Sequence, residues 1–238
     1  MPLTPKIDVE LKPVELSDLE VIAQGNIDTL APFHDDMEPE PRLADRVERQ
    51  ARRLAKLLSH PQCHSTKAVL ASGPDRGKLV GCALWQFTRR GDQPWNVKRR
   101  LVQPGSHDAD KEVDALVEEE LWRGVDVDKW DGCWTEWDTV REGFMKGAEH
   151  WYLVPLWVLP EYKGLGIGRL LLSEIIDRCD SVEPRVPIYL EASAEGKPLY
   201  EKLGFVQVGD SYYKEMIRGI ELIPGHEDNE RGQGATTA

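Results

Sequence analysis

Residues 152–172 read YLVPLWVLPEYKGLGIGRLLL, an apolar run followed by a glycine-rich turn. The continuous apolar run 152–159 is typical of a strand that is buried on both faces. Apolar residues then recur at helical spacing as far as Cys179, so the turn at 163–168 is expected to open a helix. Such a turn binds anions, because its backbone N–H groups are unpaired and the helix dipole adds positive charge.

The spacing of the glycines excludes two common nucleotide-binding motifs. A P-loop requires GxxxxGK[ST], and the sequence contains no such run. A dinucleotide fingerprint requires GxGxxG, but Gly164-x-Gly166 is followed by Arg169, and Gly166-x-Gly168 by Leu171, where the third glycine belongs. The turn therefore binds a different phosphate-bearing ligand, or it is a glycine-rich helix start without a ligand.

Short strands and one helix are expected downstream of this unit. Strands are predicted at 187–192, 205–208 and 212–217, with a helix at 195–203, and the last two strands are expected to pair as a hairpin. The polar, glycine-rich end at 223–238 is expected to be a disordered tail.

Three strands and two helices are expected upstream. The strands are predicted at 7–14, 66–71 and 78–87. The first helix is expected to begin at Ser17, and the second to cover 43–58. Ser17 and Glu20 have the spacing of a capping box. The outer face of the second helix is basic and is expected to face solvent; it carries Arg42, Arg46, Arg49, Arg52, Arg53 and Lys56.

Segment 89–149 differs from its surroundings, because it is highly charged and rich in tryptophan. It contains one clear helical pattern, with Val113, Leu116, Val117 and Leu121 on one face. Its apolar content is too thin for a separate core, so we expect a long insertion within a single domain. Trp130, Trp134 and Trp137 also follow helical spacing. They either anchor the insertion on the domain or, with Asp131, Glu136 and Asp138, form an aromatic pocket for a cation.

Composition limits the class of protein. The 238 residues include 30 Lys and Arg against 42 Asp and Glu, a net charge of −12, which disfavours nucleic acid as a partner. No apolar run approaches the roughly 18 residues of a membrane span, so no membrane association is expected. The start MPLTPKIDVELKP does not fit a secretory signal.

The cysteines indicate a reduced compartment and no metal centre. The four cysteines, at positions 63, 82, 133 and 179, form no CxxC pair, which favours a cytoplasmic location. His60, Cys63 and His64 are close in sequence, but further ligands are missing nearby, so we expect a surface loop rather than a metal site.

Two motifs in order carry a family resemblance. The first is Leu156-x-Val158-x-Pro160-x-Tyr162-Lys163-x-x-Gly166-x-Gly168-x-x-Leu171-Leu172, and the second is Leu190-Glu191-Ala192-Ser193 followed by Leu199-Tyr200-Glu201-Lys202-Leu203-Gly204-Phe205. Together they resemble the cofactor-binding and closing motifs of the GNAT superfamily of N-acetyltransferases, with Lys163 where Arg or Gln is usual. The resemblance covers 151–217 well and 7–87 only in the order of elements. The closing motif is most similar to puromycin-type and many fungal acetyltransferases.

The resemblance implies an α/β fold with mixed α+β character. Its twisted, mixed sheet has six to seven strands, flanked by helices and splayed between strands four and five. Residues 1–222 would form one acetyltransferase domain, interrupted by the insertion at 89–149. The chain would be a monomer or a homodimer.

The resemblance also implies acetyl-coenzyme A (acetyl-CoA) as co-substrate, without a metal. Backbone amides of the turn would hold its pyrophosphate, which assigns Lys163, Gly164, Gly166, Ile167 and Gly168. The main chain of Leu156, Trp157 and Val158 would pair with the pantetheine arm, and an N–H near the first two would stabilise the oxyanion. Ser193 stands where many members have an asparagine that contacts the cofactor.

For catalysis, the resemblance places Tyr200 near the sulfur, as the acid that protonates the leaving thiolate; otherwise its ring only packs under the cofactor. Glu191 would act as the base on the amine, directly or through water, or it would only anchor the ammonium group. His150 is a second candidate near the acceptor, although a lone histidine is more often structural.

The implied activity is direct acetyl transfer to a primary amine of a small molecule, without a covalent enzyme intermediate. Acceptor-binding residues would be Trp130, Trp134, Trp137 and His150. The alternatives are acetylation of protein or peptide amines, and a module that binds acyl-CoA without turnover.

Overall fold

The protein folds around one seven-stranded mixed sheet, with strand order β1-β2-β3-β4-β5-β7-β6. The structure is a computed structural model that describes residues 7–38, 43–58, 60–90 and 119–226. The strands are β1 Val9–Pro13, β2 Cys63–Leu70, β3 Leu79–Thr88, β4 His150–Val158, β5 Ile188–Ala192, β6 Val206–Gln207 and β7 Lys214–Arg218. Only β4 and β5 pair in parallel. This confirms the expected fold class and the β6–β7 hairpin.

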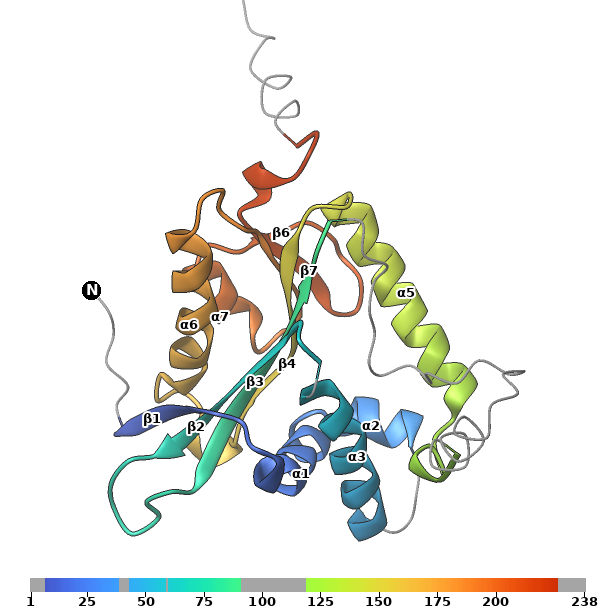
Figure 1. Ribbon diagram of the computed structural model, residues 1–238, viewed down its shortest axis with the longest axis vertical. Coiled ribbons are helices and arrows are strands. Elements are labelled where there is room, and N and C mark those ends of the chain that lie inside the picture. The colour runs from blue at the N-terminus through green and yellow to red at the C-terminus, as the bar shows by residue number, and fades with distance from the viewer. Residues whose placement is uncertain (1–6, 39–42, 59, 91–118, 227–238) are drawn as a thin grey trace, which may run out of the picture.

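Helices cover both faces of this sheet (Figure 1). They are η1 Leu16–Asp18, α1 Leu19–Thr29, α2 Ala31–Met37, α3 Leu43–Leu58, α5 Val127–Met145, η2 Pro160–Tyr162, α6 Ile167–Ser181, α7 Lys197–Lys202 and η3 Ile220–Leu222. One face packs against α6 and α7, and the other against α1 and α3 at the β1–β4 half and α5 at the β4–β7 half.

Alternation along β3 explains why both faces are covered. Ala83 and Trp85 belong to the core under α6, whereas Cys82 and Leu84 belong to the core under α1 and α3. Nine of the ten β3 residues are buried, as expected for a central strand between two helical layers.

β4 is irregular at the centre of the sheet. Ala83 pairs with Leu156 and Trp85 with Leu153, so Val154 and Pro155 together face the single residue Leu84. An extra residue of this kind is a β-bulge, which bends the strand and strengthens its twist. On its other edge β4 pairs with β5 only at Trp151–Ile188 and Tyr152–Tyr189, although both strands run further. The two strands therefore splay, as predicted.

The N-terminal helices differ from the sequence prediction in two respects. The turn before α1 is closed by Asp18, whose carboxylate accepts from the Glu15 backbone N–H at 2.7 Å, and not by the expected pair Ser17 and Glu20. The short helix α2 was not expected, because its sequence APFHDDM has little helical periodicity. Its apolar side chains Phe33 and Met37 pack against tryptophans of the segment predicted to be an insertion.

The basic face of α3 is not uniformly exposed, and this part of the prediction was wrong. Arg46 and Arg49 are buried at 5% and 3% exposure. Arg53 donates to the Glu38 carboxylate at 2.8 Å, and Glu38 itself is fully buried. The carboxylates that bury this face come from α2 and its end, a contact distant in sequence, so periodicity alone could not reveal it.

Gly25 of α1 lies directly against the Trp157 ring of β4. A Cβ added at Gly25 would lie 2.4 Å from two ring atoms. We expect Gly25→Ala to lower the free energy of unfolding by about 1–3 kcal/mol, because the close contact outweighs the better helix propensity of alanine. Urea unfolding measures this, with Gly132→Ala as the control.

A Cβ at Gly132, inside α5, meets nothing within 4 Å. That variant is expected to gain about 0.5–1 kcal/mol from helix propensity. A free energy of unfolding for Gly25→Ala equal to that of the wild type would contradict the close contact between Gly25 and the Trp157 ring.

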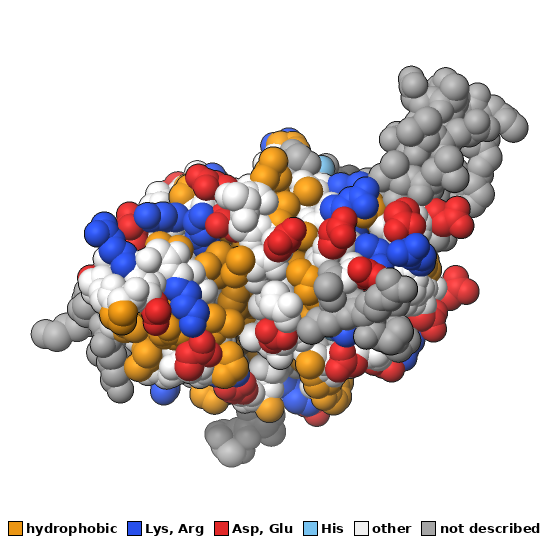
Figure 2. All heavy atoms as spheres, turned by 90° about the horizontal axis from the view of Figure 1, so that it is seen from below, with side chains coloured by type: hydrophobic (Ala, Val, Ile, Leu, Met, Phe, Trp, Pro, Cys, Tyr) orange, Lys and Arg blue, Asp and Glu red, His pale blue; other side chains and the backbone are white. Residues whose placement is uncertain are grey.

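The charged side chains are spread over the surface. On the face shown in Figure 2, acidic and basic side chains intermingle, with hydrophobic side chains exposed between them. Among the described residues, no helix combines the length and apolar character needed to cross a membrane.

Candidate active site

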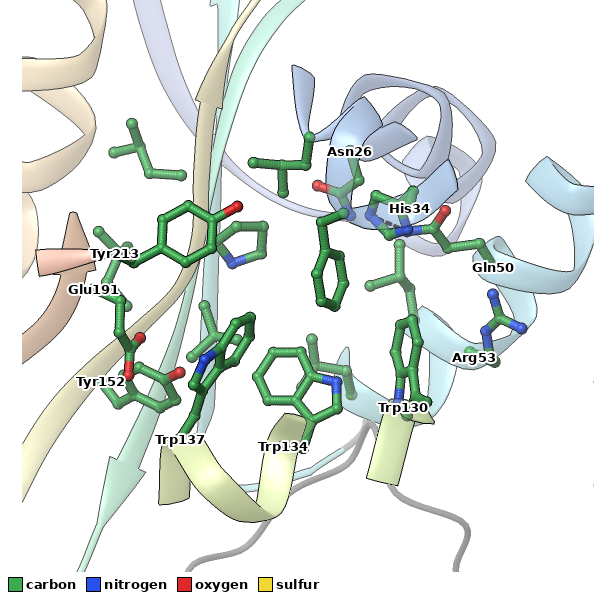
Figure 3. A pocket seen from close by; sticks show the side chains of 18 of the residues that line it. Asn26, His34, Gln50, Arg53, Trp130, Trp134, Trp137, Tyr152, Glu191 and Tyr213 are labelled. Atoms are coloured by element: carbon green, nitrogen blue, oxygen red, sulfur yellow. Dashed lines mark hydrogen bonds between the residues drawn. The ribbon is translucent and has the colours of Figure 1, made fainter. Parts of the chain in front are cut away.

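A cavity of about 160 Å³ lies where β4 and β5 splay, between α1–α3 and α5 (Figure 3). It is lined by Asn26, Leu30, Phe33, His34, Gln50, Arg53, Leu54, Leu57, Trp122, Trp130, Trp134, Trp137, Tyr152, Leu153, Val154, Pro155, Leu156, Glu191, Ser193, Tyr200 and Tyr213. Seven of the sequence-predicted site residues thus line one cavity: Trp130, Trp134, Trp137, Leu156, Glu191, Ser193 and Tyr200. Figure 3 shows two polar ends separated by tryptophans.

Glu191, on β5, supplies the carboxyl group at one end of the cavity. Its Oε1 atom is buried and has no hydrogen-bond partner among the described residues. Burial raises the pKa of this carboxyl to about 7, although Arg141 and the phenols of Tyr152 and Tyr189 favour the charged form. A carboxyl group with a pKa close to neutral pH can accept a proton and release it again.

Arg141 of α5 packs against Tyr152 at this end of the cavity. Its guanidinium lies 4.0 Å from the centre of the Tyr152 ring and donates to Asp138 at 2.7 Å. Burial raises the pKa of the Tyr152 phenol well above its usual value, so it remains a hydrogen-bond donor beside Glu191. Arg141 and Tyr152 were not predicted as site residues. Arg141 comes close to Tyr152 and Glu191 only because of the way α5 packs on the sheet, which the sequence pattern does not reveal.

Tyr200, within α7, also lines the cavity. Its ring is buried against Phe205 with centroids 5.7 Å apart, and burial raises the pKa of its phenol. The hydroxyl therefore stays protonated at neutral pH. Ser193 lies between β5 and α7, where its Oγ accepts from the Gly196 N–H at 3.1 Å and closes the turn into α7.

The glycine turn adopts the geometry that an anion site needs. Gly164 and Gly166 have positive φ of 73° and 95°, and Gly166 caps α6, which begins at Ile167. The first amides of α6 thus have no partner within the helix. A Cβ at Gly168 would lie 3.2 Å from a methyl group of Leu199, so this glycine also lets α6 approach α7. The Lys163 ammonium pairs with Glu195 at 2.8 Å.

The strand before the turn presents its main chain, not all of its side chains, to the splay. Trp157 is 3% exposed and its ring packs against α1, so only its backbone can reach a ligand between the strands. Leu156 lines the cavity, whereas Val158 belongs to the core under α6.

The tryptophans of α5 form one wall of the cavity and also anchor α5 on α2. The ring of Trp137 stacks on Phe33 at 5.5 Å, and Trp134 contacts Trp137 edge-on at 4.7 Å. The predicted carboxylate partners do not join them: Asp131, Glu136 and Asp138 are outside the lining. The carboxyl group of the cavity is Glu191 instead. Val113, Leu116 and Val117 of the predicted insertion helix lie outside the described residues, as does the tail from 227.

His150 lies apart from these groups. It is 1% exposed at the start of β4, where its Nδ1 lies 2.7 Å from the Ala148 carbonyl oxygen, and it does not line the cavity. Burial lowers the pKa of its imidazole to about 4. Within the described ranges, no cluster of three His, Cys, Asp or Glu side chains could hold a metal ion.

Comparison with known proteins agrees with this geometry. Residues 133–223 match the family model described as the acetyltransferase (GNAT) domain, and the match begins inside the segment 89–149. No curated protein sequence matches the chain.

Solved structures share the fold at low identity. An HPA2-type histone acetyltransferase and related acetyltransferase from Corynebacterium glutamicum has 18% identity and a TM-score of 0.52, covering 89% of this chain and 96% of that one. The PaiA N-acetyltransferase of Thermoplasma acidophilum, solved with coenzyme A, has 12% identity and a TM-score of 0.49, covering 89% and 99%. Arabidopsis thaliana NAA60, solved with a bisubstrate analogue, has 16% identity and a TM-score of 0.45, covering 88% of this chain and 95% of that one.

Proposed function

We propose that this N-acetyltransferase, whose residues 133–223 match the GNAT domain, moves an acetyl group from acetyl-CoA to the primary amine of a small molecule. The observation that carries the proposal is the cavity at the β4–β5 splay. It brings together Glu191, a carboxyl group with a pKa of about 7, and Tyr200, a protonated phenol, beside β4, the strand that leads to the glycine turn.

Acetyl-CoA fits the arrangement of the turn and β4. Its pyrophosphate would bind the backbone amides from Lys163 to Gly168 at the start of α6, where the helix dipole adds positive charge. Its pantetheine arm would pair with the β4 edge at 156–158, which the splay leaves without a β5 partner. A backbone N–H near Leu156 and Trp157 would then donate to the thioester carbonyl oxygen.

Glu191 and Tyr200 divide the proton transfers between them. The Glu191 carboxylate takes a proton from the bound ammonium group, and the amine nitrogen attacks the thioester carbon. A tetrahedral oxyanion forms, then collapses as the C–S bond breaks. The Tyr200 hydroxyl gives its proton to the leaving thiolate, and the resulting phenolate takes the second proton from the nitrogen of the new amide. Glu191 releases its proton to solvent, so the products are the acetylated amine and coenzyme A and both side chains are restored.

A covalent enzyme intermediate is not part of the proposal. Burial raises the pKa of the Cys63 and Cys179 thiols to about 12, so neither is a thiolate at neutral pH. None of the four cysteines lines the cavity.

A small-molecule acceptor fits the cavity better than a protein chain. Its lining comes from α1, α2, α3, α5, β4 and β5, and an aromatic wall of this size encloses a ring-sized ligand. The resemblance of Leu190–Ser193 to puromycin-type acetyltransferases agrees with such an acceptor. We place the whole activity in one domain over 1–222, working in the cytoplasm as a monomer or homodimer, without nucleic acid or a metal.

Release of coenzyme A tests the proposal. The full chain is mixed with acetyl-CoA and either a panel of small primary amines or a panel of peptides with free N-termini and lysines. We expect thiol release with at least one small amine and none with the peptides. Turnover with peptides alone would favour the protein-acetylating alternative, and coenzyme A binding without any turnover would favour an acyl-CoA binding module.

A further inference from the structure

The end of the cavity opposite Glu191 holds two buried amides that the protein leaves incompletely satisfied. Asn26 of α1 and Gln50 of α3 are 3% and 6% exposed, and both line the cavity. Asn26 Oδ1 and Gln50 Oε1 have no hydrogen-bond partner among the described residues. Figure 3 shows both side chains, with His34, at the end away from Glu191.

Such atoms are costly unless a ligand satisfies them. A buried polar group without a hydrogen bond costs about 1–3 kcal/mol, so native proteins leave few of them. The Gln50 amide is also held in place, because its Nε2 lies 3.5 Å from His34 Nε2. Two carbonyl oxygens without a partner, on residues that line one cavity, are candidate acceptors for the hydrogen-bond donor of a ligand.

The cavity has the volume that holds one aromatic ring. A cavity of about 150 Å³ lined by apolar side chains holds benzene, and this cavity measures about 160 Å³. Trp130, Trp134 and Trp137 line it together with Phe33, whose ring contacts all three of them. Aromatic walls favour a flat ring over a flexible chain through edge-on and stacked contacts.

Charge at the far end disfavours a second cation. Arg53 lies there, stacked on Trp122 at 4.9 Å, and its guanidinium is neutralised by Glu38. Arg46 and Arg49 lie on the same face of α3, with Asp35 paired to Arg46 at 2.7 Å. A second cation bound at this end would lie beside the Arg53 guanidinium, whereas the Glu191 end attracts an ammonium group.

We infer that the acceptor is an aryl-alkyl monoamine that carries an uncharged hydrogen-bond donor, such as a hydroxyl group, at the end of its ring away from the amine. The inference rests on the proposed function. Asn26 and Gln50 are the specificity-determining residues, because their carbonyl oxygens are unfilled acceptors at the end of the cavity away from Glu191. The amine lies at Glu191, the ring between the tryptophans and the donor at the two amides.

Tyramine and phenethylamine test this inference, because they differ only by the hydroxyl group. Binding is measured by tryptophan fluorescence with saturating coenzyme A, which needs no turnover, and kcat/KM is measured with acetyl-CoA. We expect tyramine to bind about 10- to 100-fold more tightly than phenethylamine. The diamine cadaverine, with a second cation in place of the ring, is expected to bind more weakly than both.

Variants identify the residues responsible. Gln50→Met and Asn26→Leu keep the volume and remove the amide, so the preference for tyramine is expected to fall about 10-fold while phenethylamine binding stays unchanged. Gln24→Met makes the same chemical change on α1 outside the lining and should leave the preference intact. Circular dichroism checks that each variant is folded.

The two levels of the proposal fail differently. No thiol release with any amine would overturn the proposed function. The binding comparison would still test the inference, because it needs no turnover. Equal binding of tyramine and phenethylamine, no binding of either, or tighter binding of cadaverine would overturn the inference. A preference that survives in both amide variants would overturn the role of Asn26 and Gln50.

Discussion

Glu191→Gln is expected to lower kcat about 10²- to 10⁴-fold, the range typical of a lost general base. The substitution keeps the size and the hydrogen-bonding oxygen of the side chain but removes its ability to accept a proton. Among the described residues that line the cavity, Glu191 is the one carboxylate, so no neighbour in the lining can replace it. Steady-state kinetics with acetyl-CoA and the best amine of the panel measure the loss.

The pH dependence gives this prediction a second readout. The pKa of Glu191 is raised to about 7, so below pH 7 the carboxyl is protonated and cannot act as a base. Wild-type kcat/KM should therefore fall about tenfold per pH unit below 7 relative to Glu191→Gln, which lacks this ionisation.

Stability should change in the opposite direction from activity. Burial favours the neutral carboxyl, so the folded protein loses stability as the pH rises from the ordinary pKa of 4.5 to about 7. Glu191→Gln should accordingly raise the Tm at pH 8. The exposed Glu221→Gln is the matched control and should alter neither property. Wild-type kcat in Glu191→Gln, or an unchanged pH profile, would rule out the base.

Tyr200→Phe is expected to lower kcat about 10²-fold or more, with the KM for acetyl-CoA nearly unchanged. Only the hydroxyl is removed, so the ring still packs against Phe205. Burial raises the pKa of this phenol, which keeps it protonated but makes it a weak acid. Its contribution is then a hydrogen bond that strengthens as charge develops on the leaving sulfur, with transfer of the proton as the C–S bond breaks.

A matched change at the neighbouring hairpin provides the control. Tyr212 is 86% exposed, and Tyr212→Phe should leave both constants at wild-type values. Isothermal titration with coenzyme A separates binding from chemistry in each variant. A kcat within about threefold of wild type in Tyr200→Phe would leave Tyr200 only a packing role, and loss of coenzyme A binding would make it a cofactor contact.

The strand, turn and helix proposed to hold the donor could be predicted from the sequence, because they are local in the chain. The strand, the glycine turn and helix α6 follow one another within 152–181, and a turn with Gly164 and Gly166 at positive φ reads directly from residue types. Glu191 and Tyr200 were also predicted, since both lie in the second contiguous motif. The raised pKa values of these two groups could not be predicted, because they result from burial, which depends on the packing of distant segments.

The acceptor side was predicted only in part, because it is assembled from distant segments. The helical spacing of the α5 tryptophans was visible, but their partner Phe33 sits on a short helix without a clear pattern. Asn26 and Gln50 look like ordinary polar positions of amphipathic helices. Their burial follows from α2 and α5 closing over α1 and α3, just as the buried carboxylate of Glu38 turned an apparently solvated basic face inward.

The sheet separates the two sets of contacts, and the splay between β4 and β5 is where they meet. The glycine turn and α6 belong to one layer, whereas Asn26, Gln50 and the α5 tryptophans belong to the opposite one. The residues proposed to select the acceptor can therefore change without disturbing those proposed to hold the donor. Such an enzyme can be re-targeted to a new amine, by selection or by engineering, through substitutions on α1, α3 and α5 alone.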